Sequence, residues 1–148
     1  MKNLAAIFIL ALIVQSCSKD KKKEDSASFT WTHRNVSHTA TSVDAYNSQA
    51  GLGLGPNQII ANNGSATFYR VSIRLSSLNP NSYTVSLTSN KFDYVDDAGY
   101  NLAGAQGTVT ISSNSDNRLS GNFSVKLINA SSDTTAITGS FSNIPVHP

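Results

Sequence analysis

Apolar and polar residues alternate along most of this chain beyond residue 28, and this pattern restricts the possible fold more than any other feature of the sequence. The segment 67–75 is the clearest case, because every second residue from Tyr69 to Leu75 is apolar and the residues between them are arginine or serine. Successive side chains of a β-strand point to opposite faces of a sheet, so such a segment predicts a strand with one buried face. Similar segments recur between clusters of Asn, Asp, Gly and Ser, and no segment after residue 17 has the periodicity of a helix.

Residues 29–148 number 120, an ordinary length for one domain with its own hydrophobic core. We therefore predict a single all-β domain, an antiparallel β-sandwich of about nine to ten strands connected mostly as a meander. A small up-and-down β-barrel is the alternative, because it also accommodates many short strands joined by tight turns.

Two similar segments lie close together near the C-terminus, Leu119-Ser-Gly-Asn-Phe123 and Ile137-Thr-Gly-Ser-Phe141. In each, a glycine stands two residues before a phenylalanine. A glycine inside a strand allows the backbone to bend, or allows a ring to lie over it. We expect these segments to form two neighbouring strands of one hairpin.

The N-terminus has the layout of an export signal. Lys2 gives a positive start, and Leu4–Val14 is an uninterrupted apolar run of eleven residues. A helix of that length spans roughly 17 Å, whereas a bilayer core requires about 20 residues. A charged start, a short apolar run and a small residue before a cleavage site are typical of a secretory signal, which we assign to residues 1–16.

The signal ends in Val14-Gln15-Ser16-Cys17, and Cys17 is the only cysteine of the chain. This segment resembles the lipobox of bacterial lipoproteins. The resemblance implies that the signal is removed before Cys17 and that fatty acids such as palmitate are attached there. It also implies anchoring to the bacterial outer membrane, on its periplasmic or its surface-exposed face. A cysteine suits this chemistry because a thiolate is a strong nucleophile.

Residues 17–28 contain the lipid-bearing cysteine followed by a polar, lysine-rich stretch that has too few apolar residues to fold, so we predict a disordered tether. From Ser26 onward the chain carries six basic and six acidic residues and therefore no formal net charge. A nucleic-acid partner requires a clustered basic face, so this class of partner is excluded. The predicted partners are the membrane, through Cys17, and a glycan or protein.

Four segments of the domain carry a resemblance to a known family. They are Phe29-Thr-Trp31-Thr, Gly107-Thr-Val-Thr-Ile111, Leu119-Ser-Gly-Asn-Phe123 and Ile137-Thr-Gly-Ser-Phe141-Ser-Asn-Ile144-Pro145. Together with the lipobox they resemble uncharacterised lipoproteins of Bacteroidota in a domain-of-unknown-function family. The resemblance covers nearly all of the mature chain and brings no assigned activity.

Two groups of residues are candidates for binding a metal ion. His33 and His38 flank a short turn, and two imidazoles brought together by a hairpin suit a transition metal. An exposed cross-strand pair is the alternative. The second group is Asp93, Asp96, Asp97 and Asn101, whose oxygens surround a glycine turn as in a calcium loop. The same residues are equally typical of a hairpin turn.

Tyr94 and Tyr100 flank that turn and are the aromatic candidates for binding a glycan, since an exposed ring offers an apolar plane with a polar tip. Ser26 and Thr134 each follow an aspartate, as in the O-glycosylation sequence of Bacteroidota, and are candidates for modification.

No catalytic residues are predicted. The sequence contains no Gly-x-Ser-x-Gly segment, and its only glutamate, Glu24, lies in the tether. No segment indicates a cofactor. The expectation is a non-enzymatic, lipid-anchored binding or surface module of the cell envelope, with a glycan-binding module as one alternative. A hydrolase is the other alternative, and a pocket lined by a histidine and two carboxylates would favour it.

Overall fold

The computed structural model describes residues 26–47, 57–64 and 69–148, which form ten β-strands and no helix. The strands are β1 (Ser28–His33), β2 (Val36–Thr39), β3 (Ser42–Tyr46), β4 (Asn57–Asn63), β5 (Tyr69–Leu75), β6 (Asn81–Ser86), β7 (Lys91–Val95), β8 (Asn101–Ser115), β9 (Arg118–Ile128) and β10 (Thr134–His147). The prediction of an all-β domain is therefore confirmed. The predicted signal 1–16, Cys17 and most of the tether lie outside the described residues. Within the described ranges, no helix is long and apolar enough to cross a membrane.

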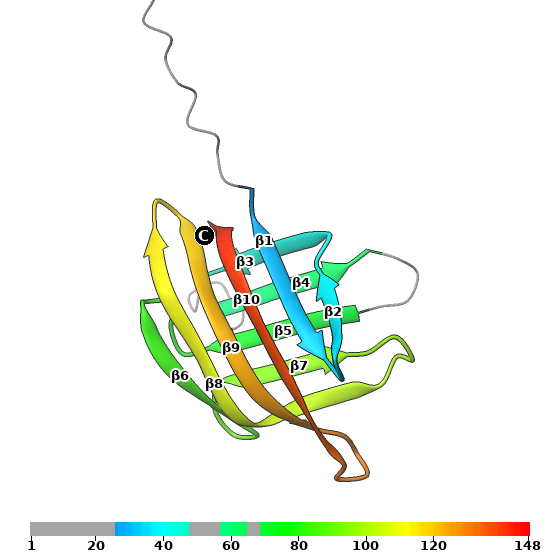
Figure 1. Cartoon of the computed structure of the whole chain (residues 1–148). Helices are drawn as coiled ribbons and strands as arrows, with labels where there is room; N and C mark the ends of the chain where they lie inside the picture. The colour runs from blue at the N-terminus through cyan, green and yellow to red at the C-terminus, as the bar shows by residue number, and fades with distance from the viewer. Residues whose placement is uncertain (1–25, 48–56, 65–68) are drawn as a thin grey trace, which may run out of the picture.

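Seven strands close into a barrel in the order β10-β3-β4-β5-β7-β8-β9, with β9 pairing back to β10. β1 and β2 extend the sheet beside β10, and β6 extends it beside β8. Figure 1 shows β1, β9 and β10 running steeply across β3, β4 and β5, which form the opposite wall. The barrel alternative thus describes the fold better than the sandwich that the alternation favoured. It is not a simple meander, because β3 and β10 pair in parallel.

The barrel closes because its two longest strands each pair with two different strands along one edge. β8 pairs with β7 at Asn101–Ala103 and with β6 at Gln106–Ile111. β10 pairs with β1 at Ile137–Ser142 and with β3 only at its last residues, Val146 and His147. The pairing with β9 shifts register in both strands, and such bulges bend a strand. A bent strand can belong to both walls, which leaves no separate pair of sheets.

The interior of the barrel is filled by aromatic and branched side chains. The ring centroid of Phe123 lies 5.5 Å from that of Phe29 and 5.1 Å from that of Phe92. Phe29 also stacks on Phe141 at 5.8 Å, with 11° between the ring planes. The inward positions of 67–75 are largely as predicted, with Val71, Ile73 and Leu75 fully buried and Tyr69 partly buried.

The two glycine–phenylalanine segments form neighbouring strands, as predicted, and they cover each other's glycines. Gly139 of β10 stands opposite Phe123 of β9, and Phe141 of β10 stands opposite Gly121 of β9. A methyl group added at Gly139 would lie 2.4 Å from the Phe123 ring, and one added at Gly121 would lie 2.5 Å from the Phe141 ring. Each ring therefore occupies the space that a side chain would otherwise fill on the neighbouring strand.

β4 and β5 pair antiparallel, with Asn57 opposite Leu75 and Asn63 opposite Tyr69. The backbone N–H of Gly64, directly after β4, donates to the hydroxyl of Thr41 at 2.6 Å, and that hydroxyl donates to the carbonyl oxygen of Asn62 at 3.2 Å. These bonds connect the end of β4 to the turn before β3.

Candidate functional site

The two histidines of one sequence candidate for a metal site meet two of the four residues of the other at one end of the barrel. His33 ends β1, His38 lies in β2, and Asp96 and Asp97 follow β7. They line a small cavity of about 160 Å³, which we call the inner chamber. Its lining residues are His33, Arg34, Val36, His38, Tyr69, Tyr94, Asp96 and Asp97.

The β1–β2 turn directs both histidines to the interior side of this hairpin. Arg34 and Asn35 form the turn with positive φ angles of 50° and 62°, the backbone that a tight two-residue hairpin requires. The register then places His38 opposite Trp31 and places Val36 opposite His33. His33 and His38 are consequently diagonal neighbours on one face rather than a directly opposed pair.

Both imidazoles pack against aromatic rings. His33 meets the ring of Tyr94 edge-on at 4.8 Å, and its side chain is 5% exposed. His38 stacks on Trp31 at 5.2 Å and lies 4.4 Å from the ring of Tyr69. The prediction of an exposed cross-strand pair is therefore wrong for His33, which the barrel interior covers.

Three polar atoms are buried at this end: Nε2 of His33 has no hydrogen-bond partner among the described residues, and the hydroxyl of Tyr94 and Nε1 of Trp31 have only each other. A buried polar group without a partner costs about 1–3 kcal/mol, so such atoms require an explanation. Burial raises the pKa of Tyr94 to about 12, while the neighbouring Trp31 indole acts in the opposite direction.

The pKa of His33 is lowered from its ordinary value of 6.5, first by burial and then by the positive charge of Arg34, against the opposing effect of Asp96. Burial also lowers the pKa of His38. The pKa of Tyr69 is raised instead, first by burial, and then by the negative charge of Asp97 and the hydrogen bond to its carboxylate. Both histidines are therefore neutral at pH 7, beside two aspartates and one arginine.

These lowered pKa values predict that the domain loses stability in weak acid. The unfolded chain binds a proton at each histidine more readily than the folded chain does, so the free energy of unfolding falls as the pH drops through 6.5 toward the folded-state pKa. Urea unfolding at a series of pH values between about 8 and 5 measures this dependence. The double variant His33→Gln/His38→Gln should lose most of it, and an unchanged slope in that variant would contradict the assignment.

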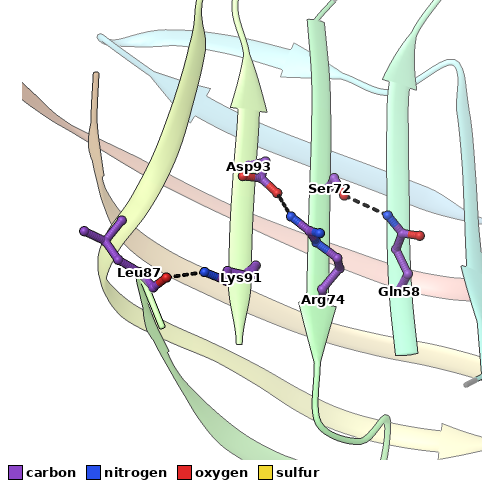
Figure 2. A network of polar contacts seen from close by, with 6 residues as sticks. All are labelled: Gln58, Ser72, Arg74, Leu87, Lys91 and Asp93. Atoms are coloured by element: carbon purple, nitrogen blue, oxygen red, sulfur yellow. Dashed lines mark hydrogen bonds and ion pairs between the residues drawn. The ribbon is translucent and has the colours of Figure 1, made fainter. Parts of the chain in front are cut away.

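The four calcium candidates do not converge on one point. Asp93 points to the outer wall of the barrel, where its carboxylate pairs with Arg74 of β5, next to the hydrogen bond from Gln58 to Ser72 (Figure 2). One carboxylate oxygen of Asp96 accepts hydrogen bonds from the backbone N–H groups of Ala98 and Tyr100, at 3.1 and 2.9 Å. Asp96 therefore stabilises the turn, as the hairpin interpretation of this segment predicts.

The outer wall carries one more polar contact near Asp93. Lys91 donates to the backbone carbonyl of Leu87 there, also shown in Figure 2. Among the described residues, no group of three or more His, Cys, Asp and Glu side chains is placed to hold a metal ion.

A wider cavity of about 620 Å³ adjoins the inner chamber, and we call it the outer cleft. It is lined by Arg34, by residues 96–102 and by Asn129, Ala130 and Ser131. Arg34, Asp96 and Asp97 line both cavities, so these three residues separate them. Tyr100 is 69% exposed at the outer cleft, whereas Tyr94 is fully buried in the core. Of the two aromatic candidates, only Tyr100 therefore has an accessible ring.

Sequence reasoning missed Arg34 and the β9–β10 turn as parts of the site. The side-chain oxygen of Asn129 accepts hydrogen bonds from the backbone N–H groups of Ser131 and Asp133, both at 2.9 Å. These bonds hold the turn in one shape beside the cleft. The run Asn-Ala-Ser-Ser-Asp indicates a turn, but nothing in it indicates which other turn lies next to it.

The two candidates for modification are exposed. Ser26 precedes β1, and Thr134 begins β10. Thr134 directly follows the turn at the outer cleft, whereas Ser26 lies at the opposite end of β1 from His33.

No curated protein and no solved structure shows a significant match to this chain. One family model does match, and it covers residues 25–145, from the end of the predicted tether almost to the C-terminus. The chain therefore belongs to the family described as domain of unknown function DUF6252.

Proposed function

We propose that this protein is a lipid-anchored, non-enzymatic binding module of the bacterial cell envelope, and that it binds a glycan in the outer cleft. The observation that carries the proposal is the exposed ring of Tyr100 at a cavity of about 620 Å³ lined mainly by polar side chains. Ligand sites commonly have volumes of about 300–1,000 Å³ and occur in the mouths of β-barrels.

The chemistry of the lining supports a sugar over an apolar ligand. A sugar ring has apolar faces and a polar edge, so it needs one aromatic plane and several hydrogen-bonding groups around it. The outer cleft offers the ring of Tyr100 together with the side chains of Asp97, Asn101 and Ser131.

The position of the cleft suits an anchored protein. β1 runs from Ser28, next to the tether, to His33 at the inner chamber, and six residues of strand span roughly 17 Å. In Figure 1 the β1–β2 and β9–β10 turns lie at the end of the molecule opposite the start of β1. A domain attached through residues 17–28 would therefore present the outer cleft away from the lipid surface.

Replacing Tyr100 with alanine tests the glycan proposal. We expect affinity for the bound sugars to fall about tenfold, because the aromatic contact contributes about 1.5 kcal/mol at most. Calorimetric titration of a panel of mono- and oligosaccharides measures the loss. Tyr46→Ala is the matched control, since Tyr46 is 40% exposed, packs on His147 and does not line the outer cleft. A panel without any binding sugar, or an equal loss in both variants, would refute the proposal.

A hydrolase is the second candidate, because the inner chamber combines His33 with Asp96 and Asp97. Two observations weigh against it. The carboxylate of Asp96 is already bonded to the turn backbone, whereas a glycosidase needs two available carboxyl groups. Among the described residues no serine, threonine or cysteine lines the inner chamber as the nucleophile of an esterase. Release of nitrophenol from nitrophenyl glycosides or esters by the protein, abolished by His33→Gln, would establish the hydrolase instead.

A further inference from the structure

We propose that the inner chamber binds a primary ammonium group, so that the preferred ligands of the site are amino sugars whose amine is free. This inference extends the proposed glycan function by naming a class of sugar. It depends on the buried, unpartnered Nε2 of His33 and the adjacent hydroxyl of Tyr94, together with the charges around them.

The buried polar atoms of His33 and Tyr94 indicate that the inner chamber binds a polar group. His33 and Tyr94 are at least nine-tenths buried and both line the chamber; Nε2 of His33 lacks a partner among the described residues, and the hydroxyl of Tyr94 has only the indole N–H of Trp31. The ring contact at 4.8 Å keeps the two side chains together, so one guest can reach both. A neutral imidazole nitrogen and a phenol oxygen each accept a hydrogen bond, and an ammonium group has three to donate.

The charges favour a cation over a neutral or anionic group. Asp96 and Asp97 contribute two negative charges, Arg34 contributes one positive charge, and both histidines are neutral at pH 7. The lining therefore carries one uncompensated negative charge. Asp97 is the available carboxylate, because Asp96 is bonded to the turn backbone whereas Asp97 is exposed and bonded to Tyr69.

The aromatic rings in the lining of the inner chamber also favour a cation. The rings of Tyr69 and Tyr94 line the inner chamber, and aromatic faces attract ammonium groups through their quadrupoles. The inner chamber of about 160 Å³ has room for an amine with its attached carbon, and the wider outer cleft of about 620 Å³ has room for the sugar ring. A chelated metal ion is disfavoured, because no group of three metal-binding side chains exists among the described residues.

The first experiment compares glucosamine with glucose by calorimetry at pH 7. We expect glucosamine to bind about tenfold or more tightly, since a hydrogen bond to a charged group contributes about 1.5–3 kcal/mol. Asp97→Asn should remove the preference for glucosamine, so that the two sugars bind that variant with similar affinities. Arg34→Gln should increase the preference, because it removes the competing cation. Asp116→Asn, a matched change at an exposed turn outside both cavities, should behave as the wild type.

The second experiment uses methylammonium alone and monitors the imidazole nitrogens of His33 by NMR. A shift of Nε2 that saturates, and that Asp97→Asn abolishes, supports the inference. This readout separates the two proposals. If no sugar binds but methylammonium shifts His33, the glycan proposal fails and the ammonium site stands. If both sugars bind equally and methylammonium leaves Nε2 unchanged, the chamber holds water only and the inference is overturned.

Discussion

Replacing Phe123 with alanine is expected to lower the free energy of unfolding by about 3–5 kcal/mol, the range for deleting a large aromatic side chain from a core. The ring is 3% exposed and contacts Phe29, Phe92 and the backbone of Gly139. Its loss leaves a cavity at the centre of the barrel and uncovers a glycine that has no side chain to fill it. Urea unfolding of the mature domain measures the change.

Gly139→Ala tests the same contact from the neighbouring strand. The added methyl group would meet the Phe123 ring at 2.4 Å and the carbonyl oxygen of Thr30 at 2.4 Å, so overpacking should cost about 1–3 kcal/mol. The clash with the Phe123 ring disappears when that ring is deleted. The double variant Phe123→Ala/Gly139→Ala should therefore lose less stability than the two single losses added together. Tyr100→Ala, at an exposed position, should change the free energy of unfolding by about 0.5 kcal/mol or less. A loss at Phe123 no larger than that would disprove the packing argument.

Replacing Cys17 with alanine is expected to move the exported protein from the membrane fraction to the soluble fraction. Two or three acyl chains bind a membrane durably at about 0.8 kcal/mol per buried CH₂, and the proposal gives this chain no other strong anchor. The tether contains four lysines, and each contributes only about 1 kcal/mol at an anionic surface. Fractionation followed by mass spectrometry of the N-terminus measures both the distribution and the lipid.

A salt wash distinguishes the two kinds of attachment. Attraction between lysines and lipid headgroups is screened at high ionic strength, whereas buried acyl chains are unaffected. The control variant therefore keeps Cys17 and replaces the tether lysines Lys19, Lys21, Lys22 and Lys23 with glutamine. This variant should stay with the membrane after the wash. Retention of the washed Cys17→Ala protein, or a Cys17 without lipid on an uncleaved chain, would refute the anchoring.

Local patterns predicted the strands well because they depend on neighbours in the chain. The alternation in 67–75 identified Val71, Ile73 and Leu75 as buried, and the matching glycine segments identified β9 and β10 as partners. The choice between sandwich and barrel was wrong for a specific reason. It depends on bulges in β8 and β10 that allow one strand to pair with two others, and the alternation continues on either side of a bulge.

The sequence indicates separate parts of the site and points to a different function for each part. No sequence pattern links His33 and His38 to Asp96 and Asp97, although all four line the inner chamber. Asp93 was grouped with its neighbours in sequence, yet its position in the strand directs it to the outer wall and to Arg74. Tyr94 and Tyr100 flank the same turn, but one is buried and the other exposed.

The sequence by itself determined that the described part of the domain is all-β, which side chains of its clearest strands face inward, and that Cys17 is the one candidate for a lipid anchor. These properties follow from the period of a strand and from the chemistry of a single thiol. Only the tertiary structure decided that the barrel closes and that the β1–β2, β7–β8 and β9–β10 turns surround one cleft. Closure brings together turns that are tens of residues apart in the chain. The distance between such turns depends on how whole strands pair, and a local sequence pattern carries no information about that pairing.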